Sequence, residues 1–212
     1  MCAFEDTPAE AAAATLDSSA DDATILALDS AREPLPAVPT FDVLLGRDRI
    51  LRRVAELAGA IRARHRDPSR LCIVAVMEGA RVFCRHLVPQ LGTALRVHEI
   101  RAKSYLGTSS SGTVSLSGAD ALDVRGKEVL LVEDIVDTGR TIARLREHMA
   151  SAGAASVEVV TLLSKPSRRE VQVQVEWIGF EIEDHFVIGF GLDFDGLYRE
   201  LPEVVIYDPA RA

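Results

Sequence analysis

Three acids in a short stretch are the residues of this chain best suited to chemistry. Glu133 and Asp134 are adjacent, and Asp137 follows three residues later. Neighbouring carboxylates suit two vicinal sugar hydroxyls, or a Mg²⁺ ion that those hydroxyls hold. Asp137, on the loop, could accept a proton. The polar turn that it opens consists of Asp137, Thr138, Gly139, Arg140 and Thr141.

The residues around this turn predict a strand before it and a helix after it. The apolar run Val129–Val132 is typical of a strand buried on both faces of a parallel sheet. Ile142, Leu145 and Met149 have the spacing of a helix that packs on one face. Unpaired N–H groups at a helix start attract phosphate, and a glycine such as Gly139 allows close approach. A phosphorylated ribose would therefore place its sugar over the acids and its 5′-phosphate in the turn.

An ordinary βα loop with solvated acids and a threonine N-cap is the alternative explanation of the turn. The whole stretch 129–142 argues against it, because it combines a buried strand, two acids, Asp-Thr-Gly and a second threonine. This stretch closely resembles the signature that binds phosphoribosyl diphosphate (PRPP) in type I phosphoribosyltransferases. The resemblance implies an α/β fold, with an open, mostly parallel, twisted sheet flanked by helices and a small hood over the sheet edge.

Length and composition are consistent with one such domain. The chain has 212 residues, of which 48% are hydrophobic, and no apolar run reaches 18 residues. The first residues lack the basic start and apolar stretch of a signal peptide, so we expect a soluble cytoplasmic protein without a membrane partner. Cys2, Cys72 and Cys84 have no metal-ligand spacing, and we expect Cys72 and Cys84 to be buried as small apolar residues.

The net charge of -8 is concentrated at the start of the chain. Residues 1–40 contain eight acids and one arginine and are rich in alanine and proline, so we interpret them as a disordered acidic tail. The domain would then span residues 41–212. Because that body is nearly neutral, nucleic-acid binding is not expected.

Other helices and strands are expected along the domain. A helix is predicted at residues 48–65, and another, after Glu78-Gly79, carries Val82, Phe83, Leu87 and Leu91. Strands are predicted at residues 71–77, 94–101 and 157–163, and residues 171–180 alternate between apolar and polar.

In the resembled family, the loop at Glu78 and Gly79 binds pyrophosphate through backbone amides and contains a non-proline cis peptide, here Met77–Glu78. Many relatives have a lysine where Glu78 stands. An anion facing pyrophosphate is unfavourable, so either the Glu78 side chain points away or affinity is reduced. A solvated acid near a helix N-terminus is the alternative interpretation.

The glycine- and serine-rich segment 103–112 follows the third predicted strand. Its position and its Lys103, Ser104 and Tyr105 resemble the flexible loop that closes over the site in this family and excludes water. A hairpin tip without a function is the alternative.

The carboxyl-terminal half resembles the hypoxanthine-guanine phosphoribosyltransferases, with Lys165 after a strand and the order G-x-G-L-D-x-x-x-x-Y-R-x-L-P from Gly189 to Pro202. The resemblance implies that Lys165 binds the 6-oxo group and N7 side of a purine. Phe186 would stack on the ring and Val187 would offer main-chain groups. Asp193, beside the purine, would hold a second Mg²⁺, and Arg199 would bind pyrophosphate. Individually, Phe186 and Val187 could instead be core residues, and Asp193 and Arg199 solvated charges.

The implied reaction belongs to purine salvage: ribose 5-phosphate passes from PRPP to N9 of hypoxanthine or guanine, giving IMP or GMP and pyrophosphate. Mg²⁺ would be held by Glu133, Asp134 and Asp193, with Asp137 as the base. The family also implies a homodimer or homotetramer. A xanthine-preferring transferase stays open, because C2 recognition would rest on main-chain atoms. A PRPP-sensing regulator that binds nucleic acid is the other alternative, disfavoured by the neutral body.

Overall fold

The computed structural model describes residues 41–92, 95–105 and 113–208. The predicted acidic tail, residues 1–40, lies outside the described residues, as does most of the predicted closing loop, residues 106–112. The domain boundary near residue 40 therefore stays a prediction. Within the described ranges, no helix combines the length and apolar character needed to cross a membrane.

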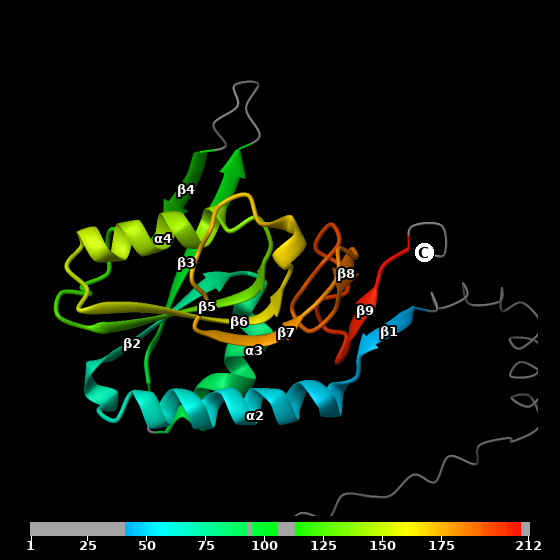
Figure 1. Ribbon diagram of the computed structural model, residues 1–212, viewed down its shortest axis with the longest axis horizontal. Coiled ribbons are helices and arrows are strands. Elements are labelled where there is room, and N and C mark those ends of the chain that lie inside the picture. The colour runs from blue at the N-terminus through cyan, green and yellow to red at the C-terminus, as the bar shows by residue number, and fades with distance from the viewer. Residues whose placement is uncertain (1–40, 93–94, 106–112, 209–212) are drawn as a thin grey trace, which may run out of the picture. The chain divides into compact units, whose positions relative to one another are not determined.

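A six-stranded sheet forms the centre of the domain, with the strand order β4-β3-β2-β5-β6-β7. All neighbouring strands are parallel except β3 and β4, which confirms the predicted mostly parallel sheet. Figure 1 shows the strands fanning across the molecule. Their bounds are β2 Leu71–Met77, β3 Val97–Tyr105, β4 Thr113–Ser117, β5 Glu128–Val136, β6 Ser156–Ser164 and β7 Trp177–Glu181.

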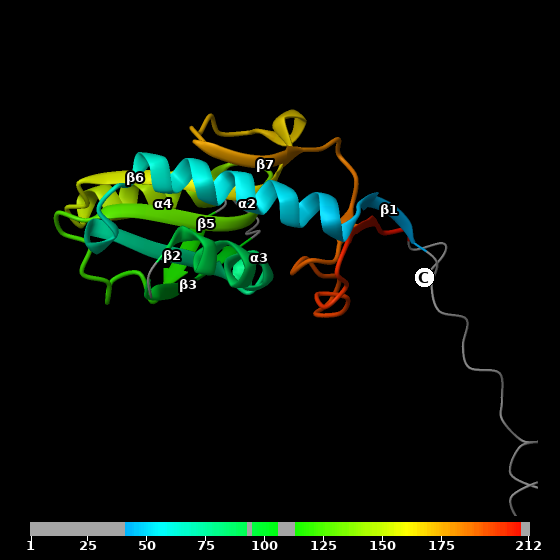
Figure 2. The same ribbon diagram turned by 90° about the horizontal axis from the view of Figure 1, so that it is seen from below.

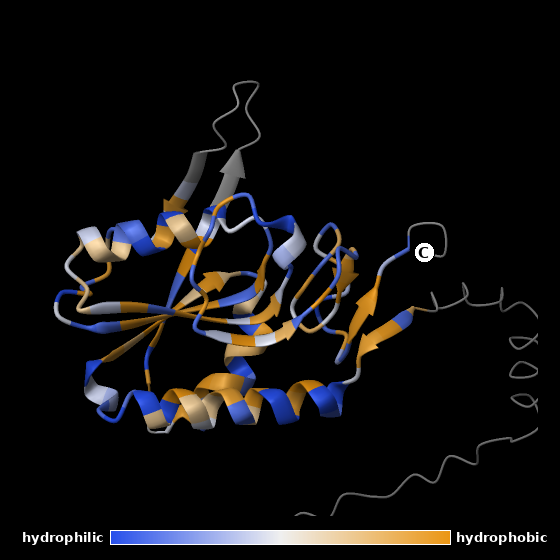
Figure 3. Ribbon diagram, viewed as in Figure 1, coloured by the Kyte–Doolittle hydropathy of each residue, from blue (hydrophilic) through white to orange (hydrophobic). Residues whose placement is uncertain are grey.

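Helices cover both faces of this sheet. Helices α2 (Arg47–Arg64) and α3 (Ala80–Leu87) lie on one face, and α4 (Arg140–Ser151) lies on the other (Figures 1 and 2). Figure 3 shows apolar residues alternating with polar ones along α2. They repeat with helical spacing because only one face of α2 is buried: Ile50, Val54, Leu57, Ala58 and Ile61. Short 3₁₀ turns are η1 Pro68–Arg70, η2 Val88–Leu91 and η3 Pro166–Arg168.

A small antiparallel sheet forms the predicted hood. It has the order β1-β9-β8, with β1 Asp42–Leu45, β8 Val187–Ile188 and β9 Val204–Ile206. The loop between β8 and β9 packs on the loop after β2, because a Cβ added at Gly191 would lie 2.2 Å from the carbonyl oxygen of Gly79. The hood is thus held against the carboxyl edge of the main sheet.

Some predicted strand boundaries are wrong. Strand β5 does not stop before the acids but runs to Val136, because Glu133 pairs with Thr161 of β6. Strand β3 runs to Tyr105 and pairs with β4, so residues 103–105 are strand rather than loop. The alternating segment 171–180, for which no strand bounds were predicted, is strand only from Trp177, where β7 begins to pair with Val160 of β6.

Candidate active site

Glu133 and Asp134 lie side by side within β5, near the carboxyl edge of the sheet. The Oε2 atom of Glu133 is buried and has no hydrogen-bond partner among the described residues. Asp134 Oδ1 accepts a hydrogen bond from the Ile135 N–H at 2.8 Å. A Cβ added at Gly79 would lie 1.6 Å from Asp134 Oδ2. The loop at Glu78 and Gly79 can therefore lie directly against this carboxylate only because Gly79 has no side chain.

The surroundings of the acid pair disfavour its negative charge. Burial, followed by the adjacent Asp134 carboxylate, raises the pKa of Glu133 well above its ordinary value. Burial also raises the pKa of Asp134, although the Ile135 N–H and the Arg199 charge oppose that effect. A buried oxygen without a partner and a raised pKa are what a cation ligand shows before the cation binds. The hard carboxylate oxygens therefore fit Mg²⁺.

Cys84 reports on the same environment. Burial, with contributions from the charges of Glu99, Glu133 and Asp134, raises the pKa of its thiol to about 12. Cys72 and Cys84 are both buried free cysteines, as predicted. The Cys84 thiol therefore stays protonated at neutral pH and is not a nucleophile.

Glu133 is expected to make the ligand-free protein less stable as the pH rises. Its folded-state pKa is raised, so the folded state keeps a proton that the unfolded state loses, and stability falls as the pH rises above about 4.5. Each pKa unit of difference between the folded and unfolded states corresponds to about 1.4 kcal/mol of the free energy of unfolding. Denaturant unfolding between pH 5 and 8 should show that the free energy of unfolding falls less steeply with pH in Glu133→Gln than in the wild type. Equal slopes of this free energy against pH would contradict the expectation.

The turn after β5 brings Asp137 and Gly139 to the start of α4. Gly139 has a φ of +85°, and a Cβ there would lie 2.5 Å from the Val171 carbonyl oxygen, so a glycine is required twice over. It is also the N-cap of α4, without a side-chain cap, so the threonine cap weighed above is not formed. Thr138 Oγ1 instead accepts from the Arg140 N–H at 3.4 Å.

Two of the predicted charged residues are engaged by partners that the sequence did not indicate. Asp137 Oδ1 accepts a hydrogen bond from Arg168 Nε at 3.2 Å. The Arg140 guanidinium pairs with Glu170 at 2.5 Å. Arg140 therefore contributes its backbone N–H to the turn, while its side chain is directed to Glu170.

Glu78 is neutralised by two arginines. Its carboxylate accepts hydrogen bonds from Arg81 at 2.7 Å and from Arg101 at 3.0 Å. The hydrogen bonds from Arg101 and then Arg81 lower the pKa of Glu78, so it stays ionised. The peptide bond Met77–Glu78 is cis, as the resemblance implied. The group of three side chains has a net charge of +1, which removes the expected repulsion of pyrophosphate.

Replacing Glu78 by Gln should strengthen PRPP binding. The change raises the local charge from +1 to +2, and one unit charge at 4 Å in water is worth about 1 kcal/mol. We expect the KM for PRPP to fall up to about fivefold at low salt, and the gain to shrink at high salt because ions screen exposed charges. Initial rates at several salt concentrations test this. A rise in KM would mean that Glu78 is needed to orient the arginines.

Arg199 and Asp193 lie in the loop between β8 and β9 and pair with each other. Arg199 Nη2 is 2.7 Å from Asp193 Oδ1, and Arg199 Nη1 donates to the Gly191 carbonyl at 2.6 Å. The second oxygen of Asp193 accepts from the Gly196 N–H at 2.7 Å. Because Gly191 contacts Gly79, the Asp193–Arg199 pair adjoins the loop at Glu78 and Gly79.

Lys165 is buried at the carboxyl end of β6. Its ammonium donates to the His185 carbonyl at 2.6 Å and lies 3.4 Å from Asp184 Oδ1. A lysine has three N–H donors, so it can also bind a carbonyl of a ligand. Phe186, which follows His185 in the chain, is 53% exposed and makes ring contacts with Phe194 and Tyr207. An exposed ring held by other rings is a suitable platform for a planar base.

Val187 has an inward side chain and outward main-chain groups. Its side chain is buried, in agreement with the core interpretation weighed above. The Tyr207 N–H donates to the Phe186 carbonyl, and Val187 is paired with Ile206 in the antiparallel ladder. Hydrogen-bonded and non-hydrogen-bonded pairs alternate in such a ladder, so the Val187 N–H and C=O point away from β9, to the open edge of β8.

The structure brings together most of the predicted site. The acid pair, the turn, Gly79 and Arg199 meet at one sheet edge, with Lys165 following the next strand. Lys103, Ser104 and Tyr105 are strand residues of β3, and the loop beyond them lies outside the described residues. Sequence reasoning missed Arg81, Arg101 and Arg168. The sequence contains no signal for their roles beyond their position at or near the predicted loops.

Comparisons with known proteins agree with this geometry. The model of the phosphoribosyl transferase domain matches residues 44–195. Hypoxanthine phosphoribosyltransferase of Escherichia coli K12 is 39% identical over 167 residues, which are 78% of this chain and 94% of that protein. Hypoxanthine-guanine phosphoribosyltransferase of Bacillus subtilis is 36% identical over 169 residues, or 79% and 93% of the two chains.

A solved structure supports the same assignment. Hypoxanthine phosphoribosyltransferase from Trypanosoma cruzi, in complex with the product IMP, superimposes with a TM-score of 0.75 at 30% identity and covers 84% of this chain and 100% of that one. The chain therefore belongs to the phosphoribosyltransferase family, in its hypoxanthine and hypoxanthine-guanine branch.

Proposed function

We propose that this protein transfers ribose 5-phosphate from PRPP to N9 of hypoxanthine or guanine and releases pyrophosphate, a reaction of purine salvage. The observation that carries the proposal is the meeting of the buried Glu133 and its half-buried neighbour Asp134, the turn at Asp137 and the buried Lys165 at one sheet edge. In an open α/β sheet, ligands bind at that edge.

PRPP would be held by both ends of this edge. The backbone N–H groups from Thr138 to Thr141, with the threonine hydroxyls, would bind the 5′-phosphate. Glu133 and Asp134 would bind the ribose hydroxyls, and their charge would favour the cationic carbon that forms as pyrophosphate leaves. The loop at Gly79, with Arg199, would bind pyrophosphate. Mg²⁺, bound by Glu133 and Asp134 and by Asp193, would neutralise charge on the leaving group.

The purine would lie between Phe186 and the turn. Lys165 would donate to the 6-oxo group, and the outward Val187 main chain would meet the N1–C2 edge. Asp137 would accept the proton from N7 as N9 attacks the ribose. Because main-chain groups rather than a side chain would meet C2, hypoxanthine and guanine would both be accepted, and xanthine stays open as an alternative substrate. The homodimer or homotetramer implied by the family is part of this proposal.

Pyrophosphate release from PRPP and Mg²⁺ tests the proposal, with hypoxanthine, guanine, xanthine, adenine and uracil supplied separately. We expect turnover with hypoxanthine or guanine and none with adenine or uracil. Turnover with xanthine above both would favour the xanthine transferase. No turnover, with PRPP still bound, would reject the enzyme and favour the PRPP-sensing regulator, which a gel shift at several salt concentrations would detect.

A further inference from the structure

Arg168 is positioned between the candidate base and the candidate purine site. Its Nε lies 3.2 Å from Asp137 Oδ1, and its Nη1 lies 3.5 Å from Asp184 Oδ2. The other oxygen of Asp184 is 3.4 Å from the Lys165 ammonium. A continuous row of alternating charges therefore joins three loops, which follow β5, β6 and β7.

We propose that Arg168 is a positioning residue, which orients the Asp137 carboxylate and couples it to the purine-binding loop. The inference rests on the proposed function, because Arg168 has something to position only if Asp137 is the base and the loop at Asp184 lies beside the bound purine. It explains why a half-exposed arginine lies between two acids of different loops.

The orientation follows from which oxygen is held. Arg168 donates to Oδ1 of Asp137, and within the described ranges no hydrogen bond to Oδ2 is found. The neighbouring Arg169 donates to the carbonyl of the same aspartate and to that of Val136, so its main chain is held as well. One oxygen is thus fixed and the other is free to accept the proton from N7.

Arginine is suited to this task in a way that lysine is not. Its planar guanidinium presents donors in a rigid fork, so one side chain can contact two carboxylates in fixed directions. Lysine offers a single point charge. The three side chains are also 39–50% exposed, and exposed ion pairs contribute little to stability, so removal of Arg168 should leave the fold intact.

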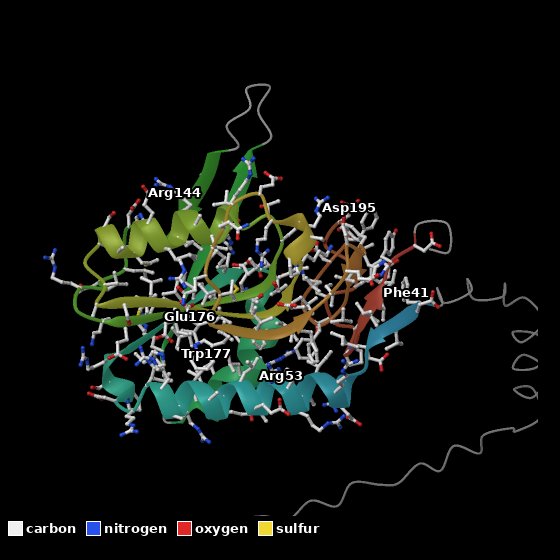
Figure 4. The ribbon with its side chains drawn as sticks, in the orientation of Figure 1. Phe41, Arg53, Arg144, Glu176, Trp177 and Asp195 are labelled. Carbon is white, nitrogen blue, oxygen red and sulfur yellow. The ribbon has the colours of Figure 1, made fainter. Side chains whose placement is uncertain are left out.

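The test compares Arg168→Gln with the wild type and with Arg144→Gln. Arg144 is an equally exposed arginine that pairs with Glu147 on the outer side of α4, away from the sheet (Figure 4). Arg168→Gln should lower kcat with hypoxanthine at least roughly tenfold, because small misplacements of a catalytic group are costly. The KM for hypoxanthine should rise, whereas the KM for PRPP and the melting temperature should not change. Arg144→Gln should match the wild type, and Arg168→Lys should recover part of the loss.

A double-mutant cycle separates positioning from a general effect of charge. In an Asp137→Asn background, Arg168→Gln should cost less than about twofold, because the group that it positions is already disabled. A loss of equal size in both backgrounds, or an unchanged kcat in Arg168→Gln, would overturn the proposal and leave the enzyme assignment intact. A wild-type protein without turnover on any purine would instead reject the proposed function itself.

Discussion

Asp137→Asn is expected to lower kcat with hypoxanthine roughly 100- to 10,000-fold, the usual contribution of a general base, and to leave the KM for PRPP nearly unchanged. The amide keeps an oxygen that can accept from Arg168 Nε, and the contact of Arg169 with the main chain is unaffected. The change therefore removes the proton acceptor at Oδ2 and little else.

Initial rates with each substrate varied in turn measure the two parameters separately. Asp195→Asn is a matched control: Asp195 is an exposed acid of the hood (Figure 4), and its φ of +50° is a conformation that asparagine readily adopts. That variant should keep wild-type kinetics. If Asp137→Asn lost turnover and PRPP affinity to the same extent, Asp137 would be a binding residue and its role as the base would be rejected.

The helices and strands that carry the site could be predicted because the apolar residues within each of them already show which positions are buried. Residues 71–77 form β2 with the predicted bounds, since an apolar run between a proline turn and a glycine needs no knowledge of its neighbours. Ile142, Leu145 and Met149 are buried on α4, as their spacing indicated. The acid pair could be predicted as well, from its place beside such a run.

Strand ends and ion pairs could not be predicted, because distant partners decide them. Thr161 of β6 continues the ladder past Glu133, and β4 continues β3 past Arg101, although neither partner is visible in the local pattern. Arg168 and Arg169 are likewise indistinguishable in sequence. The fold directs one to the Asp137 side chain and the other to its main chain.

Gly79→Ala should abolish productive PRPP binding in a protein that still folds. The backbone at Gly79 is α-helical, with φ −60° and ψ −43°, so alanine meets no conformational strain. Its Cβ, however, would lie 1.6 Å from Asp134 Oδ2 and 2.5 Å from Asp134 Cγ. The clash falls on the end of a side chain that can rotate, so the carboxylate moves and the acid pair is broken.

A displacement of about 1 Å in a site of this kind costs roughly 100-fold in rate, and we expect at least that loss in kcat/KM for PRPP. Calorimetric titration with Mg²⁺ and PRPP should show the matching loss of affinity, at a melting temperature close to that of the wild type. Gly59→Ala is the control, because Gly59 lies inside α2 with no atom within 4 Å of an added Cβ. It should gain about 0.5–1 kcal/mol of stability and keep full activity. Normal PRPP binding by Gly79→Ala would show that the Asp134 carboxylate does not hold the ribose.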